Sequence, residues 1–192
     1  MTTVLAVDLG SASGRVLAGT LTDGRLDVTD IHRFKHEARR RQDGTLTWDV
    51  ATMEAETIIG LKKALEQFPD ARSVSIDTWG VDWAPLDENG DLVGDVIAYR
   101  DERTSRTLDA FRERIGDREF FDLTGNQPAT INTANQLFAY LQENPADAQR
   151  VAGVLFLPDY FVYRLTGAVG WSRTIASTSG LLTPGGGDFN DE

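Results

Sequence analysis

The sequence predicts an α/β domain, and the first third of the chain supplies the evidence. Four apolar residues at 4–7 indicate a buried strand, which leads into a Gly/Ser-rich turn at 10–14. Residues 15–34 contain two further stretches of strand-like pattern, joined by a Thr-Asp-Gly hairpin signal. Apolar residues then recur at helical spacing over 50–68. Three strands followed by a packed helix are typical of an α/β domain.

Length and composition limit the possible functions. The 192 residues suffice for one domain with a sizeable core. Thirty acidic and nineteen basic residues give a formal net charge of −11, which argues against unassisted binding to nucleic acid or to an anionic membrane. Because the chain has no cysteine, it has no disulfide and no cysteine-ligated zinc. No run of about 20 apolar residues is present, and we expect a cytoplasmic protein.

The turn after the first strand has the chemistry of a polyphosphate site. Small residues at 10–14 let backbone N–H groups approach anionic oxygens, and the serines add hydroxyl donors. Arg15 adds a forked cation, and Asp8 is placed to hold Mg²⁺ directly or through water. A dinucleotide-binding unit is disfavoured because a strand, not a helix, follows the turn, and because the glycines lack the G-x-G-x-x-G spacing. An ordinary tight turn is the alternative interpretation.

The rest of the chain continues with both kinds of element. Asp49 suits the N-cap of the helix at 50–68, and Pro69 ends that helix. Residues 1–182 are interpreted as one domain, and the Gly-rich acidic segment 183–192 as a linker or the end of a shortened chain. We expect further strands at 73–78, 96–99 and 154–157, and helices at about 108–115, 133–141 and 158–167.

Several segments together resemble the FGGY carbohydrate kinases. The likeness extends from about residue 4 to residue 182, and within the family it is greatest to the rhamnulokinase branch. It implies the ribonuclease-H-like fold of the actin, hexokinase and chaperone ATPase group, with a mixed five-stranded sheet flanked by helices. The segments that carry the likeness are residues 8–15, 77–82, 99–104 and 158–167, supported by Trp48-Asp49 and residues 132–137.

This resemblance implies a phosphotransferase. The family transfers the γ-phosphoryl group of ATP to a sugar hydroxyl in the presence of Mg²⁺, and the rhamnulokinase branch converts L-rhamnulose to L-rhamnulose 1-phosphate. Xylulose, ribulose, fuculose and glycerol are other substrates within the family. The implied partner of this chain is a C-terminal kinase domain that binds adenine. Neither nucleic acid nor a membrane is expected as a partner.

The resemblance also implies two groups of site residues. Gly80 matches a sugar-contacting position, where a missing side chain lets the backbone touch the substrate. An indole face suits the apolar face of a sugar, and a carboxylate suits its hydroxyls. The sugar group is therefore Gly80 with Trp79, Asp82 and Arg100. The nucleotide group is Ser11, Ala12, Ser13, Gly14 and Arg15, with Asp8 near the metal.

No catalytic residue is expected among these 192 residues. The family's general base is an aspartate in a segment that follows the region ending at Glu192, so the chain alone is expected to be inactive. Asp82 and Asp101 are candidates for a substitute base, because each ends a strand on the presumed ligand side. Two other functions stay open: a non-catalytic sugar- or nucleotide-binding module, and a phosphatase that uses the Asp8 metal site on water.

Some of these residues have structural alternatives. Gly80 also suits a plain turn. Arg100, Asp101 and Arg103 are as suited to a structural ion-pair cluster as to substrate contact. His32 and His36 lie four residues apart along a predicted strand, and they could share a face and a metal. Because no third ligand is evident nearby, we expect a solvated pair.

Overall fold

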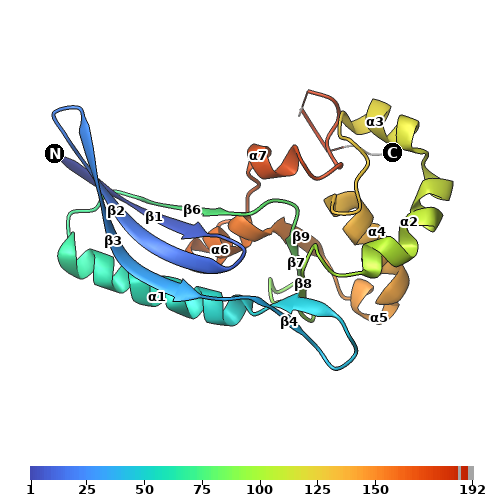
Figure 1. Cartoon of the computed structure of the whole chain (residues 1–192), viewed down its shortest axis with the longest axis horizontal. Helices are drawn as coiled ribbons and strands as arrows, with labels where there is room; N and C mark the ends of the chain where they lie inside the picture. Colours follow the sequence, from blue (N-terminus) through green and yellow to red (C-terminus); the bar gives the residue numbers. More distant parts are fainter. Residues whose placement is uncertain (186, 190–192) are drawn as a thin grey trace. The chain divides into compact units, whose positions relative to one another are not determined.

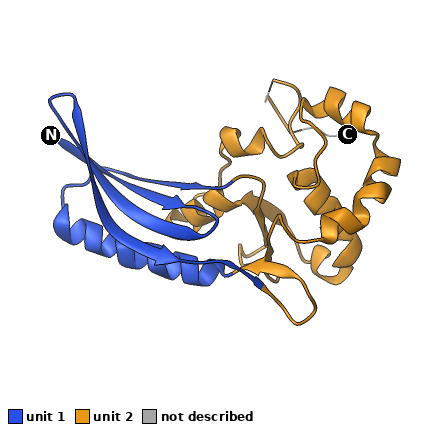
Figure 2. Ribbon diagram, in the orientation of Figure 1, with its two compact units in different colours: residues 1–39, 49–79 blue, residues 40–48, 80–192 orange. Residues whose placement is uncertain are grey.

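The structure, a computed structural model, describes residues 1–185 and 187–189. The chain divides into two compact units, which Figure 2 colours separately. The first unit contains residues 1–39 and 49–79, and the second contains residues 40–48 and the chain from Gly80 onward. Each unit is described by itself.

The first unit is a mixed sheet with one long helix (Figure 1). Its strands are β1 (Thr2–Leu9), β2 (Ser13–Thr22), β3 (Arg25–Lys35) and β6 (Val74–Thr78), in the order β3-β2-β1-β6. Strands β1, β2 and β3 pair antiparallel, whereas β6 pairs parallel with β1. Helix α1 (Val50–Gln67) packs against β1, β2 and β3.

Alternation along the strands places the core of this unit between α1 and one face of the sheet. Leu5, Val7 and Leu9 of β1 are buried, and so are Val16 and Ala18 of β2. The Asp49 side chain caps α1 by accepting a hydrogen bond from the Thr52 backbone N–H at 3.0 Å, as the sequence predicts. The buried residues of α1 are Val50, Met53, Thr57, Gly60 and Ala64.

The second unit is built from two small sheets and several helices. One sheet consists of β4 (Ala38–Arg40), of which only Arg40 belongs to this unit, with β5 (Leu46–Trp48) and β8 (Val96–Ile97). In the other sheet, β7 (Trp83–Leu86) pairs antiparallel with β9 (Gly153–Phe156). The helices are α2 (Arg103–Arg114), α3 (Asp117–Thr124), α4 (Thr133–Glu143), α5 (Pro145–Ala148), α6 (Leu157–Thr166) and α7 (Arg173–Ala176).

The mixed α/β architecture is confirmed, including the three opening strands and the helix after them. The main sheet has four hydrogen-bonded strands where the resemblance implies five, because β9 hydrogen-bonds to β7 in a separate sheet. Helix α3 is an element that the sequence analysis does not predict. It has only eight residues, about two turns, which is too short for a periodic pattern to identify a helix by itself.

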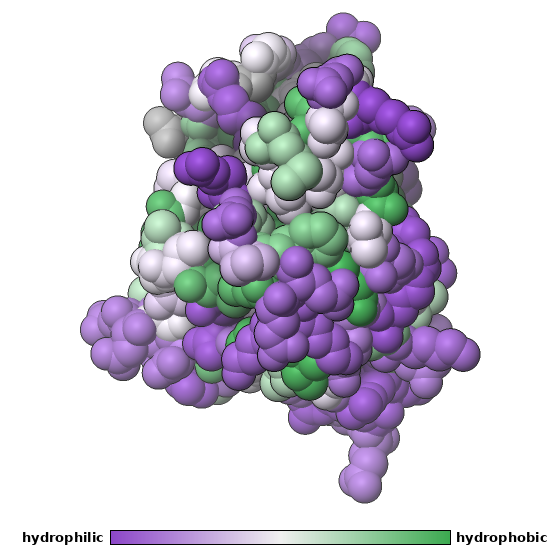
Figure 3. Space-filling view, turned by 90° about the vertical axis from the view of Figure 1, so that its left-hand side faces the viewer, coloured by the Kyte–Doolittle hydropathy of each residue, from purple (hydrophilic) through white to green (hydrophobic). Residues whose placement is uncertain are grey.

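Within the described residues, no helix is both long and apolar enough to cross a membrane. Hydrophilic residues dominate the face shown in Figure 3, with apolar patches between them. Of the predicted linker 183–192, residues 186 and 190–192 lie outside the described residues. In the part that is described, the Thr183 backbone N–H donates to the Asp188 carbonyl at 3.0 Å, and Leu182 forms a β-bridge with Phe189.

We predict that Gly60→Ala destabilises the protein, although alanine favours a helix by about 1 kcal/mol over glycine. A Cβ at Gly60 would lie 2.9 Å from Val16 Cβ, so the helix and the sheet would have to separate. Overpacking of this kind costs about 1–3 kcal/mol in the free energy of unfolding, measured by urea denaturation. The control is Gly153→Ala in β9, where an added Cβ meets no atom within 4 Å. Equal effects of the two substitutions would contradict the prediction.

Candidate active site

The turn between β1 and β2 is the predicted nucleotide hairpin. The Gly10 backbone N–H donates to the Ser13 carbonyl at 2.9 Å, which closes the turn. Ser11, Ala12 and Ser13 are exposed. Gly14 is buried instead, because its Cα lies under the Phe34 ring where a Cβ would collide. The turn therefore offers three small exposed residues to a ligand, while Gly14 fixes the turn to the sheet.

Asp8 and Arg15 lie next to each other at the base of this hairpin. They are register partners on β1 and β2, on the face of the sheet opposite α1. Arg15 Nε donates to Asp8 Oδ2 at 2.6 Å, and both side chains are partly exposed. The predicted cation and the predicted metal-binding acid thus form an ion pair with each other.

The residues here suit a magnesium ion that is also held by phosphate oxygens and water. Asp77 on β6 is the register partner of Asp8, so two carboxylates from parallel neighbouring strands lie on one face. Mg²⁺ is commonly bound through one or two carboxylates together with phosphates and waters. Among the described residues no group of three or more His, Asp or Glu is arranged to hold a metal by itself.

His36 joins the hairpin to Trp79. The His36 backbone N–H donates to the Ala12 carbonyl at 3.3 Å, and its ring stacks on the Trp79 indole with centroids 5.8 Å apart. Burial lowers the pKa of the His36 imidazole, and hydrogen bonds to the backbone of Gly10 and Ser13 oppose this shift. His36 therefore links the hairpin to Trp79 through its backbone and its ring.

The two histidines are not a solvated pair. Nε2 of His32 lies 2.7 Å from Glu56 Oε2, and His36 is only 9% exposed. Their partners differ: α1 supplies Glu56 to His32 of β3, whereas His36 follows the end of β3 and packs on Trp79.

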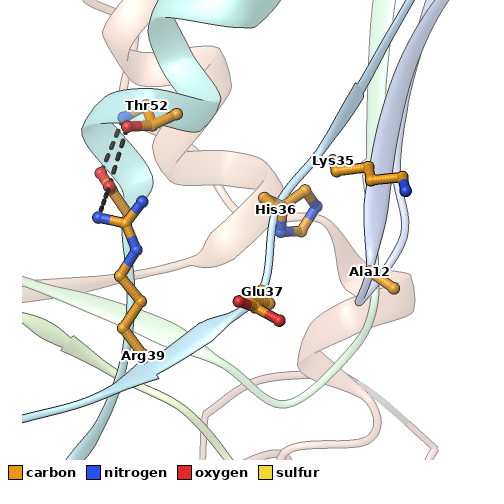
Figure 4. Close-up of a pocket in the computed structure, with 7 residues that line it drawn as sticks. Ala12, Lys35, His36, Glu37, Arg39 and Thr52 are labelled. Carbon is orange, nitrogen blue, oxygen red and sulfur yellow. Dashed lines mark hydrogen bonds and ion pairs between the residues drawn. The ribbon is translucent and has the colours of Figure 1, made fainter.

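A cavity of about 320 Å³ lies beside the hairpin, lined by Ala12 and His36 among others (Figure 4). Asp49 also lines the cavity, and it pairs with Arg39 at 2.7 Å while it caps α1. Lys35 and Glu37 complete a rim of mixed charge. The charged lining residues are two cations, Lys35 and Arg39, and two anions, Glu37 and Asp49, so the formal charges around the cavity cancel.

In the second unit, the predicted sugar-contacting segment is a strained turn. Val81 has φ of +70°, in the left-handed region that a β-branched residue rarely adopts, at a cost of about 1–3 kcal/mol. Its carbonyl accepts from Thr133 Oγ1 at 2.8 Å and from Gln136 Nε2 at 3.1 Å. Two hydrogen bonds at about 1 kcal/mol each offset a strain of that size, so they can hold the turn.

A buried polar cluster surrounds this turn, and we call it the Arg103 network. Arg103, 1% exposed, donates from Nη1 to the Ala98 carbonyl at 3.0 Å and from Nη2 to Gln136 Oε1 at 2.7 Å. Burial lowers the pKa of the Arg103 guanidinium, and the nearby carboxylates of Asp101 and Asp82 oppose this shift. The network consists of Trp48, Asp82, Asp101, Arg103 and Gln136.

Asp82 and Asp101 are enclosed in this network. Asp82 is fully buried, and its Oδ2 accepts from Trp48 Nε1 at 2.6 Å. Asp101 accepts from the backbone N–H groups of Leu46 at 2.8 Å and Arg103 at 2.9 Å. Of the cluster Arg100–Asp101–Arg103 weighed from the sequence, the two buried members are therefore structural. The carboxylate of Asp82 does not face solvent in this structure, so here it positions the chain around it.

Gly80 and Arg100 are more accessible than these acids. Gly80 is half-buried, and a Cβ there would lie 3.5 Å from Thr178 Oγ1, an ordinary contact. Arg100 is exposed, with its guanidinium carbon 5.2 Å from the Tyr99 ring centroid and its Nε 2.7 Å from the Tyr99 hydroxyl. Trp79 belongs to the first unit and Gly80 to the second, so the boundary between the units falls inside this motif.

Sequence reasoning did not link Thr133 or Gln136 to the turn at Val81. Both are fully buried on the first turn of α4, and they act on residues about fifty positions away. The one signal was the polar composition of residues 132–136 at the start of an otherwise amphipathic helix.

The chain is similar to known carbohydrate kinases in sequence and in fold. Residues 3–192 match the profile of the N-terminal domain of the FGGY family of carbohydrate kinases. A rhamnulokinase of Mannheimia succiniciproducens is 39% identical over 181 residues, which cover 93% of this chain and 37% of that protein. The chain thus spans little more than a third of the length of this relative.

Solved structures show the same fold at low identity. A ligand-bound xylulose kinase from Lactobacillus acidophilus has a TM-score of 0.85 at 13% identity, over 100% of this chain and 39% of that one. A glycerol kinase from Plasmodium falciparum, solved with ADP, has a TM-score of 0.83 at 16% identity, over 100% and 40%.

We predict that His36 makes the stability of the protein fall at acid pH. Because the folded-state pKa of His36 is lowered, the unfolded chain binds a proton more readily, and stability is lost as pH drops below the ordinary value of 6.5. The free energy of unfolding of wild type minus that of His36→Gln should therefore shrink between pH 7.5 and pH 5.5. A difference that stays constant with pH would refute the effect.

Proposed function

The chain belongs to the FGGY family of carbohydrate kinases, and from this membership we propose that it is the N-terminal half of an ATP-dependent ketose kinase. We propose L-rhamnulose as the substrate of the complete protein and L-rhamnulose 1-phosphate as its product. The observation that carries this choice is the 39% identity to a rhamnulokinase over 93% of the chain. Because ketose kinases act on metabolites, we also propose a cytoplasmic location.

In this proposal the β1–β2 hairpin binds the phosphates of ATP. The exposed residues 11–13 offer backbone N–H groups and two hydroxyls, and Arg15 offers a forked cation. Binding a phosphate would draw Arg15 away from Asp8 and leave that carboxylate for a metal. Mg²⁺, when bound, would neutralise charge on the transferred phosphoryl group. Asp8 would hold it, with Asp77 as the neighbouring acid.

The sugar would be recognised by the segment around Gly80. The Gly80 backbone would contact the substrate, the Trp79 indole would cover an apolar face, and the exposed Arg100 would donate to hydroxyls. Asp82 has a positioning role in this proposal, because its buried carboxylate holds Trp48. This assignment replaces the direct contact between Asp82 and sugar hydroxyls that the resemblance implies.

The general base would come from chain beyond Glu192. The burial of Asp82 and Asp101 supports this view, since a base must reach the hydroxyl whose proton it takes. A C-terminal domain would supply that base and the adenine site. We therefore expect the 192-residue chain alone to release no ADP in the presence of ATP and sugar.

The substrate is tested with the complete protein in an ADP-release assay. L-rhamnulose should have the highest kcat/KM in a panel with xylulose, ribulose, fuculose and glycerol. One methyl group or hydroxyl typically changes kcat/KM by about 10- to 100-fold, so the preference should be clear. Higher kcat/KM with another ketose would reassign the substrate. Sugar binding with no turnover would instead indicate a non-catalytic sensor.

We predict that a substitution at the hairpin affects the KM for ATP, and that a substitution at Gly80 affects the KM for sugar. Arg15→Ala should raise the KM for ATP about tenfold or more, through loss of a charged hydrogen bond, and leave the KM for sugar unchanged. Gly80→Ala, which the structure accommodates, should raise the KM for sugar, leave the KM for ATP unchanged and cause no loss of stability. Arg25→Ala, on the exposed β2–β3 hairpin, is the control for removing an arginine. An unchanged KM for both substrates in either site variant would remove that residue from the site.

A further inference from the structure

Val81 is the feature of the candidate site that the proposed function leaves unexplained. Among the described residues only Val81 and Asp23 combine a side chain with a positive φ. Asp23 lies in the β2–β3 hairpin turn next to Gly24, where a short polar residue is tolerated. Val81 is β-branched, and it directly follows Gly80. A glycine would adopt this backbone without strain, as at eight described glycines with positive φ.

The surroundings of Val81 hold it in this conformation. Thr133 Oγ1 and Gln136 Nε2 both donate to the Val81 carbonyl, at 2.8 and 3.1 Å, and both side chains are fully buried. We call these two hydrogen bonds the carbonyl clamp. On the other side, the Asp82 carbonyl accepts from the Leu157 backbone N–H at 2.9 Å. The chain is thus fixed immediately after Gly80, with the strained residue between Gly80 and the buried Asp82.

The clamp is also joined to the exposed Arg100 loop. Gln136 uses its Nε2 on Val81 and its Oε1 on Arg103, and Arg103 in turn binds the carbonyl of Ala98. Arg103 begins the helix that follows Arg100. One side chain, Gln136, therefore connects the Gly80 segment with the segment that carries Arg100.

We propose that Thr133 and Gln136 are positioning residues for the sugar, and that they act through the backbone of Val81. The clamp keeps Val81 in a left-handed conformation that it would otherwise leave, and this conformation sets the direction of the Gly80–Val81 peptide toward the hydroxyls of a ketose. The inference rests on the proposed function, since it concerns the same sugar site. Neither of these two side chains touches the substrate itself.

The proposal is tested by measuring the KM for L-rhamnulose and the melting temperature of single and double variants of the complete protein. Thr133→Val removes one clamp hydrogen bond with little change of shape, so Val81 relaxes and the KM for L-rhamnulose rises about tenfold, as for one lost hydrogen bond. Val81→Gly alone changes that KM less than about twofold and raises the melting temperature, because the strain is gone. The double variant regains a KM within about threefold of wild type, because glycine keeps the turn without the clamp.

Two controls separate positioning from general damage. Thr133→Ser keeps the hydroxyl and should resemble wild type. The KM for ATP should stay within about twofold in every variant, since the hairpin residues are unchanged. If Thr133→Val does not fold, Thr133→Ala serves in its place. Folding that is restored only when Val81→Gly is added supports the clamp, whereas misfolding in both backgrounds overturns it.

The inference fails if Thr133→Val leaves the KM for sugar unchanged, if the double variant is no better than Thr133→Val, or if Val81→Gly lowers the melting temperature. Failure of the proposed function has a different signature. In that case the wild-type complete protein phosphorylates none of the sugars, while the melting temperatures of the four variants still report whether Val81 is strained and clamped.

Discussion

The buried guanidinium of Arg103 is the charge on which the second unit depends. A buried cation is costly unless it is paired and hydrogen-bonded. Here Asp101 pairs with Arg103 at 3.8 Å, the nearby charge of Asp82 also favours the guanidinium, and the hydrogen bonds go to Ala98 and Gln136. These partners come from three separate segments of the chain, and Trp48 adds a fourth through Asp82. Moving any one of these segments would leave a buried charge without its partners.

The regular elements could be predicted because they follow from local patterns. The helix at 50–67 is fixed by apolar spacing, by Asp49 at its start and by Pro69 after its end. The hairpin at 10–14 could likewise be identified from its small residues and the strands around it. The burial of Arg103 and Asp82 could not, because charged residues usually lie at the surface and each needs partners more than thirty residues away. The left-handed backbone of Val81 has no local signal at all, since it is imposed by α4.

The two candidate regions, the hairpin in the first unit and the Gly80 segment in the second, follow different electrostatic rules. At the hairpin, Asp8 and Arg15 are partly exposed, so water screens them and their ion pair is easily exchanged for a ligand. In the second unit the charges of Asp82, Asp101 and Arg103 are buried, so they are not available to a ligand. A chain with a net charge of −11 can thus offer a cation to an anionic nucleotide at an exposed turn. The polar groups of the second unit are used to shape the backbone.

The carbonyl clamp has a consequence for anyone who recombines related kinases to change the sugar they accept. A graft limited to residues 79–82 would carry the strained valine into a host whose helix need not offer a hydroxyl and an amide at the matching places. The unit that must be transferred together is discontinuous in sequence. It consists of residues 79–82 and residues 133–136, which lie more than fifty positions further along the chain. Sequence exchange in this domain is therefore better planned by hydrogen-bonded partners than by contiguous blocks.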